Sequence, residues 1–148
     1  MFKKVVWATD GSEAADQALP LARALAAEGG GELMVVHCVE LTVPGKSAGI
    51  YPIHADEEVL KAKIERQVAE LSDGGVRARL ETTRATVGKA AQAIADATRE
   101  QQGDVIVVGT RGHTALGGLL LGSVTQRLLH VAACPVLAVP VNGSHATS

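Results

Sequence analysis

Short apolar runs alternate with helical patterns along this chain. Residues 5–8, 33–39 and 105–108 are runs in which nearly every side chain is apolar and many are β-branched. Such runs are typical of parallel strands that are buried on both faces. Residues 76–83 instead alternate between apolar and polar side chains, which predicts a strand with one solvated face or a strand at a sheet edge. Residues 136–139 form a last short apolar strand between two prolines.

Helical patterns occupy the intervals between these strands. Ser12 is placed to cap the first helix, and the glycines at 29–31 are placed to end it. Pro20 falls inside that helix and is expected to kink it or to remove one hydrogen bond. Apolar spacing predicts further helices that open at Asp56, follow Gly88 and cover residues 124–132.

This alternation, repeated five times, implies an α/β fold with an open parallel sheet, right-handed crossovers and helices on both faces. The polar strand at 76–83 is expected at an edge of that sheet. Residues 41–55 contain prolines and glycines without periodicity. They predict a long mobile loop, which either covers a ligand or is a plain disordered connection.

The composition fits a single domain with an aliphatic core. The chain has 148 residues, of which 47% are hydrophobic but only 2% are aromatic. We expect residues 1–141 to form one domain and residues 142–148 to be a flexible tail. The net charge of −2 favours neither nucleic acid nor an anionic membrane as a partner. No apolar run is long enough to span a bilayer and the N-terminus does not read as a signal peptide, so a cytoplasmic protein is expected.

The cysteines, the strand histidine and two arginines have plain structural explanations. The two cysteines, Cys38 and Cys134, are far apart and outside any Cys-x-x-Cys motif, which favours buried, inert thiols. His37 lies in an apolar strand and is expected to be packed or hydrogen-bonded rather than a ligand. Arg77 and Arg79 alternate along the polar strand and are expected on a solvated face.

The stretch from 109 to 123 carries the strongest functional signal. It joins the 105–108 strand to the last helix, whose N-terminus offers free N–H groups and the positive end of a dipole to an anion. Glycine clusters usually serve only turns, and that plain alternative stays open for this loop. Neither a P-loop nor a dinucleotide fingerprint is present. The anion-binding hypothesis uses the backbone at Gly109, Gly112 and Gly122, the Ser123 hydroxyl, and Arg111 and His113 as cationic donors.

The spacing of this loop resembles the Gly-x2-Gly-x9-Gly-Ser signature of universal stress proteins in their ATP-binding branch. Further matches are residues 9–12 after the first strand, residues 35–39 in the second and residues 134–139 in the last. Together these matches cover nearly the whole chain, residues 3–139. The resemblance implies a Rossmann-like, three-layer, five-stranded parallel sheet with strand order 3-2-1-4-5. In that order the first and fourth strands are neighbours, and ligands bind beyond their carboxyl ends.

The resemblance also implies an adenine-nucleotide site. Backbone and apolar groups near Ala8 and Cys38 would enclose the base, while Asp10 would approach the ribose or a bridging Mg²⁺. ATP, with or without Mg²⁺, is the expected cofactor, and Asp10 and Ser123 are the candidate metal ligands. The full set of candidate nucleotide-binding residues is Ala8, Thr9, Asp10, Cys38, Val39, Gly109, Arg111, Gly112, His113, Gly122, Ser123 and Val124.

We expect a regulatory stress-response protein that holds ATP. The alternatives are a slow ATP hydrolase or autophosphorylating enzyme, and an AMP or cyclic-AMP sensor. The plain alternative for Asp10 is that it only caps the turn after the first strand. The family resemblance and the apolar last strand point to a homodimer through residues 135–141, although Pro135 and Pro140 are also suited to protecting a sheet edge.

Overall fold

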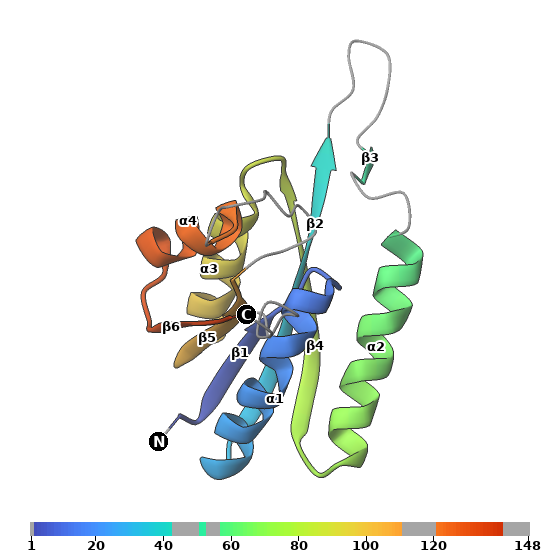
Figure 1. The fold of residues 1–148 in the computed structure, drawn as a ribbon, viewed down its shortest axis with the longest axis vertical. Helices are drawn as coiled ribbons and strands as arrows, with labels where there is room; N and C mark the ends of the chain where they lie inside the picture. Colours follow the sequence, from blue (N-terminus) through green and yellow to red (C-terminus); the bar gives the residue numbers. More distant parts are fainter. Residues whose placement is uncertain (1, 43–50, 53–56, 111–120, 141–148) are drawn as a thin grey trace, which may run out of the picture.

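The computed structural model describes residues 2–42, 51–52, 57–110 and 121–140, and it shows one sheet flanked by helices (Figure 1). No helix in this part of the chain is long and apolar enough to cross a membrane. The strands are β1 (Lys4–Ala8), β2 (Glu32–Thr42), β3 (Tyr51–Pro52), β4 (Arg77–Thr86), β5 (Val105–Gly109) and β6 (Val136–Val139). The helices are α1 (Glu13–Glu28), α2 (Glu57–Asp73), α3 (Ala90–Glu100) and α4 (Ser123–Val131).

The five long strands are parallel and confirm the predicted order. β1 pairs with β2 on one side and with β5 on the other. β4 adds to β2, and β6 adds to β5. The spatial order is therefore β4-β2-β1-β5-β6, which is 3-2-1-4-5 when the five parallel strands are counted in chain order. Among the described residues β4 pairs only with β2, so the polar strand is at an edge, as its alternating pattern predicts.

The central strands are buried on both faces, which explains why they are almost continuously apolar. Val5 and Trp7 of β1 pack with α1 and α2, whereas Val6 and Ala8 pack with α3 and α4. The same alternation holds in β2 and β5, because successive side chains of a strand point to opposite faces. The helices thus form one layer on each side of the sheet. This confirms the predicted three-layer α/β fold.

The first helix begins and ends at the positions that its sequence predicts. The Ser12 hydroxyl accepts the Ala15 N–H at 3.2 Å, and the helix ends at Gly29. Pro20 lies on the exposed side within α1, where it withholds one N–H while the helix continues to Glu28. The indole N–H of Trp7 donates to the Ala15 carbonyl at 3.0 Å, so β1 is tied to the first turns of α1.

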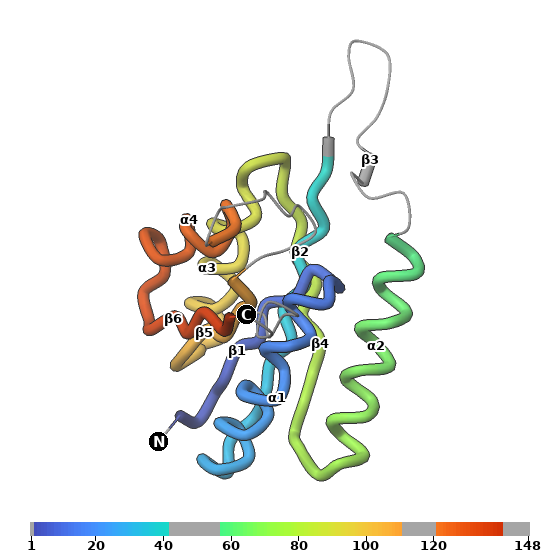
Figure 2. Tube along the Cα trace, viewed as in Figure 1, coloured from blue at the N-terminus to red at the C-terminus, as the bar shows by residue number. Residues whose placement is uncertain are grey.

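The prediction of a loop over residues 41–55 is wrong at residues 41–42, which belong to β2, and at residues 51–52, which form β3. β2 continues to Thr42, and Tyr51–Pro52 forms a short antiparallel strand beside it (Figure 1). The tube in Figure 2 shows the coloured part of β2 extending beyond the end of β1. Pairing with β4 extends β2, since Leu41 lies opposite Thr86 and its carbonyl accepts the Val87 N–H at 3.2 Å. β2 therefore runs well past the last residue of β1. Residues 43–50 and 53–56 lie outside the described part of the chain.

Candidate functional site

The crossover helices change faces between β1 and β5. α1 and α2, which follow β1 and β2, cover one face, whereas α3 and α4, which follow β4 and β5, cover the other. In open α/β sheets this switch point is where ligands bind, beyond the carboxyl ends of the strands. Trp7 lies opposite Val107, so the Thr9–Asp10 segment and Gly109 leave the sheet side by side. The structure thus places the Thr9–Asp10 segment of the predicted site next to Gly109.

A tight turn follows β1. The Gly11 N–H donates to the Thr9 hydroxyl and the Ser12 N–H donates to a carboxylate oxygen of Asp10, each at 3.0 Å. Gly11 has a φ of +81°, a left-handed conformation that favours glycine. The Asp10 contact is the one that the plain capping alternative predicts. Asp10 is therefore held just beyond the carboxyl end of β1 by the turn to which it belongs.

The edge of β2 beyond β1 presents backbone groups that lack a neighbouring strand. The Thr9 N–H donates to the Val36 carbonyl at 2.9 Å, so the peptide groups of Val36 face β1. Hydrogen-bonding groups alternate sides along a strand, so those of Cys38 face the same way. β1 stops at Ala8, and among the described strands β3 occupies this edge only from Leu41 onward. Cys38 thus offers one N–H and one C=O to the space beyond β1.

The side chain of Cys38 is a shielded thiol. It is partly buried and packs against the core cluster under α3 and α4. Burial, followed by the nearby carboxylates of Glu40 and Glu57, raises the pKa of this thiol to about 11. Burial also raises the pKa of Cys134. Both thiols are therefore protonated near neutral pH, which supports the expectation that they are inert. Each is half-buried, however, rather than buried as predicted.

His37 is a buried, hydrogen-bonded strand histidine, as predicted. Its Nδ1 lies 3.0 Å from the Thr9 carbonyl oxygen and its Nε2 lies 2.5 Å from Oε1 of Glu57. Nδ1 must carry a hydrogen, because a carbonyl oxygen only accepts. The ring therefore links the end of β1 to the first residue of α2. This link was not predicted, because Glu57 is distant in sequence and follows no pattern that identifies its partner.

Gly109 is required by packing against α1. A Cβ atom at this position would lie 2.5 Å from the carbonyl oxygen of Ala14, in the first turn of the helix. The carbonyl of Gly109 accepts the hydroxyl of the buried Thr125 at 2.9 Å. The absent side chain therefore lets α1 approach β5. This is a different reason for the glycine from the phosphate contact that the sequence suggested.

The start of α4 has free donors, although not all of those predicted. Gly122 is the N-cap, and its own N–H donates to the Thr110 carbonyl at 2.6 Å. Across α4, all of which is described, there is no side-chain cap and no acidic residue in the first turn. The N–H groups of Ser123 and Val124 consequently begin the helix without intrahelical acceptors. Arg111, Gly112 and His113 lie outside the described residues.

Candidate metal ligands do not form a cluster in the described part of the chain. No group of three His, Cys, Asp or Glu side chains there is placed to hold an ion. Asp10 and Ser123 would therefore need oxygen atoms from a bound phosphate or from water to complete the coordination of Mg²⁺, which commonly retains such ligands.

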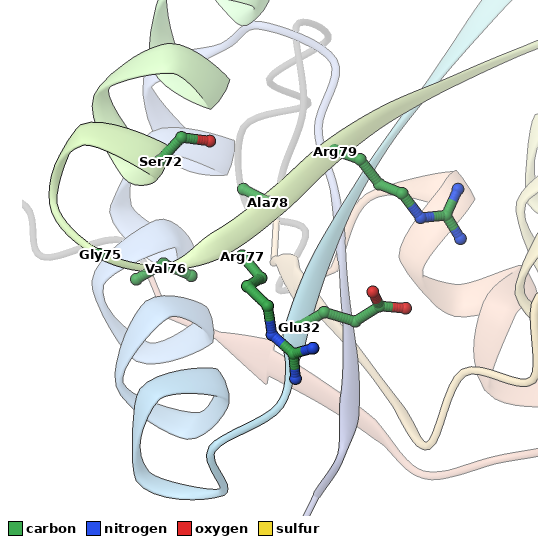
Figure 3. A pocket seen from close by; sticks show the side chains of 7 residues that line it. All are labelled: Glu32, Ser72, Gly75, Val76, Arg77, Ala78 and Arg79. Carbon is green, nitrogen blue, oxygen red and sulfur yellow. The ribbon is translucent and has the colours of Figure 1, made fainter.

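A cavity of about 470 Å³ lies at the opposite end of the sheet, where β2 and β4 begin (Figure 3). Its charged side chains already have protein partners. Arg77 donates to the Gly30 carbonyl at 3.1 Å, Arg79 donates to Gln101 at 2.7 Å, and Glu32 pairs with Lys4 at 3.2 Å. The expectation of a solvated face holds for Arg77, which is exposed, whereas Arg79 is half-buried. We place no ligand in this cavity.

A doubly wound parallel sheet whose crossover helices change faces between β1 and β5 defines a Rossmann-like α/β protein. The sequence profile of the universal stress protein family matches residues 1–140, and the chain belongs to this family. It is 36% identical to "Universal stress protein in QAH/OAS sulfhydrylase 3'region" of Thermus aquaticus over 141 residues, covering 94% of this chain and 99% of that protein. This confirms the resemblance to the universal stress protein family and identifies a stress-response protein. Membership of the ATP-binding branch stays a prediction.

Solved structures share the same architecture. That of the protein MJ0577 of Methanocaldococcus jannaschii matches with a TM-score of 0.78 and 25% identity, covering 97% of this chain and 99% of that one. A universal stress protein in complex with cAMP matches with a TM-score of 0.61 and 22% identity over 93% and 96% of the two chains. The Archaeoglobus fulgidus universal stress protein in complex with dAMP gives 0.64 and 24% over 94% and 98%. At these identities the last two matches show the shared fold.

Proposed function

We propose that this universal stress protein binds an adenine nucleotide, with ATP as the favoured ligand, at the carboxyl ends of β1, β2 and β5. The observation that carries the proposal is the pair of unfilled hydrogen-bonding surfaces on either side of β1. One is the edge of β2 at Cys38, and the other is the N-terminus of α4 at Ser123. Two strand spacings, about 10 Å, separate β2 from β5, a span that suits a base at one end and phosphates at the other.

The base would bind at the β2 edge. Adenine carries an amino donor next to a ring acceptor, which complements the C=O and N–H of Cys38. Guanine carries an acceptor in place of the amino group and would place two acceptors face to face at the Cys38 carbonyl. Ala8, Thr9 and Val39 would supply the surrounding surface. We therefore expect adenine to be preferred over guanine.

The phosphates would bind at α4. The free N–H groups of Ser123 and Val124 and the positive end of the helix dipole favour an anion. In this proposal Gly109, Gly112 and Gly122 shape the loop, and Arg111 and His113 contact the phosphates. Where Mg²⁺ accompanies ATP, Asp10 and the Ser123 hydroxyl would hold it, and the ion would neutralise phosphate charge. The two solved relatives in complex with cAMP and dAMP support this class of ligand.

Calorimetry with ATP, cyclic AMP and GTP tests the proposal on wild-type protein stripped of co-purified ligand. Gly122 has a φ of −70° and a ψ of 162°, which any residue adopts, so Gly122→Val should fold. Its side chain would crowd the phosphates. Loss of two charge-assisted hydrogen bonds, each contributing roughly 1.5–3 kcal/mol, would weaken ATP binding by about 100-fold or more. Gln126→Val, at an exposed position of the same helix, is the matched control.

The possible outcomes separate the candidate functions. No measurable ATP binding by wild-type protein would overturn the proposal, and unchanged affinity in Gly122→Val would remove α4 from it. Tighter binding of cyclic AMP than of ATP would favour the sensor alternative, to which the cAMP complex of a relative points. Linear phosphate release that Asp10→Ala abolishes would identify a slow hydrolase.

We further propose a homodimer through residues 135–141. In the described part of the chain β6 pairs only with β5, which leaves its other edge open to a second copy. The side chain of Leu137 is 37% exposed on this strand. An apolar edge strand of this kind favours pairing between copies.

A further inference from the structure

One face of α2 contacts the turn that carries Asp10. A Cβ atom at Gly11 would lie 2.6 Å from Cδ2 of Leu60, so α2 packs directly on this turn. Glu57, Leu60, Lys63 and Gln67 succeed one another at helical spacing on that face. Figure 1 shows α2 alongside α1 and β4, on the face of the sheet that α1 also covers.

Lys63 forms the most direct polar link between α2 and the turn. Its ammonium group donates to the Gly11 carbonyl and to Oδ2 of Asp16, each at 2.7 Å. The other oxygen of Asp16 accepts from Gln67 at 2.9 Å. Gly11 lies just before α1 and Asp16 lies in its first turn. One cation on α2 therefore fixes the turn and the start of α1 relative to each other.

A second link fixes the other end of the turn. The Thr9 carbonyl contacts His37, whose far nitrogen contacts Glu57 at the start of α2. Asp10 is thus flanked by two carbonyls, those of Thr9 and Gly11, that are both held from the α2 side. Its backbone position depends on α2, even though α2 contributes none of the candidate nucleotide contacts.

We propose that Lys63 is a positioning residue of the nucleotide site, holding the Gly11 carbonyl so that Asp10 is presented to the crevice in one orientation. This inference rests on the proposed function for its effect on affinity. The ordering of the turn itself does not depend on any ligand. Removing the ammonium would free the Gly11 carbonyl to rotate and would enlarge the set of conformations that Asp10 samples.

The test compares Lys63→Met with Lys63→Arg and with Lys61→Met, an exposed lysine two residues earlier on α2. Calorimetry should show ATP binding about tenfold weaker in Lys63→Met, unchanged in Lys61→Met and largely restored in Lys63→Arg. Amide hydrogen exchange at Gly11 and Ser12, whose N–H groups are bonded within the turn, should be about tenfold faster in Lys63→Met alone. Both measurements are made well below the unfolding midpoint of every variant.

Failure of the positioning role and failure of the proposed function give different experimental results. If wild-type protein binds ATP and Lys63→Met binds it equally well, Lys63 is a structural residue and the inference is overturned. If wild-type protein binds no nucleotide, the proposed function fails, and unchanged exchange in Lys63→Met would then overturn the positioning role as well. Should Lys63→Met fail to fold, Lys63→Gln replaces it with the same expected directions.

Discussion

Gly109 at the end of β5 and Ala14 in the first turn of α1 are in backbone contact, and a Cβ atom on Gly109 would lie 2.5 Å from the Ala14 carbonyl oxygen. Backbone cannot swing aside as a flexible side chain can. We expect Gly109→Ala to force α1 away from β5 and to lower the free energy of unfolding by about 1–3 kcal/mol. Urea denaturation followed by circular dichroism measures this change. An unchanged midpoint would show that the two elements are not in contact.

Thr125 secures the other side of Gly109. Its buried hydroxyl donates to the Gly109 carbonyl, so Thr125→Val leaves a buried acceptor without its donor. We expect a loss of about 1–3 kcal/mol in unfolding free energy. Thr125→Ser keeps the hydroxyl and loses only a methyl group, at a cost of about 0.8 kcal/mol. Chemical denaturation should therefore rank serine above valine, and the reverse order would contradict the role of the hydroxyl.

The Cys38 thiol should titrate far above the ordinary range. Its pKa rises from 9.0 to about 11 in the folded protein, mainly through burial. The folded state therefore retains the proton longer than the unfolded state does. The resulting stabilisation is complete below pH 9.0 and is lost as the pH rises towards 11.

Thiolate absorbance in a Cys134→Ala background measures that titration. Glu40→Gln should lower the pKa of Cys38, because the Glu40 carboxylate is one of the charges that raise it. A midpoint near 9.0 in the folded protein would contradict the burial of this thiol.

Leu137 tests the proposed dimer. Leu137→Lys places a charge on the exposed side of β6, where a second copy would bury it unpaired. We expect the wild-type protein to sediment as a dimer and the variant as a monomer at the same concentration. Leu129→Lys, at an exposed apolar position on α4, is the control for added charge. A monomeric wild-type protein at high concentration would rule out this interface.

The sequence predicts the fold well because periodicity reports burial. The apolar run at 105–108 identifies a central strand, and the alternation at 76–83 identifies an edge strand, without knowledge of any contact. The sequence did not predict that β2 extends beyond Val39 or that Tyr51–Pro52 forms a strand. Pairing between strands, rather than a local pattern, sets these limits. At these positions the pairing with a neighbouring strand outweighs the local strand propensity of the residues.

The candidate site is predictable only in outline. The glycine spacing located the start of α4, but it did not show that the Gly122 N–H is bonded to Thr110 or that Gly109 serves the packing of α1. The links from Lys63 and Glu57 to the β1–α1 turn join residues far apart in sequence. Only the folded chain shows these partners, since lysine and glutamate on a helix most often face solvent.

Trp7 is the only tryptophan of the chain, fully buried in β1 with its indole bonded to the Ala15 carbonyl. Fluorescence excited at wavelengths that tryptophan absorbs and tyrosine does not therefore comes from this single indole. The indole lies at the junction of β1 and α1, next to the turn that carries Asp10. Loosening of that junction will shift the emission maximum, so the protein contains its own unlabelled optical probe.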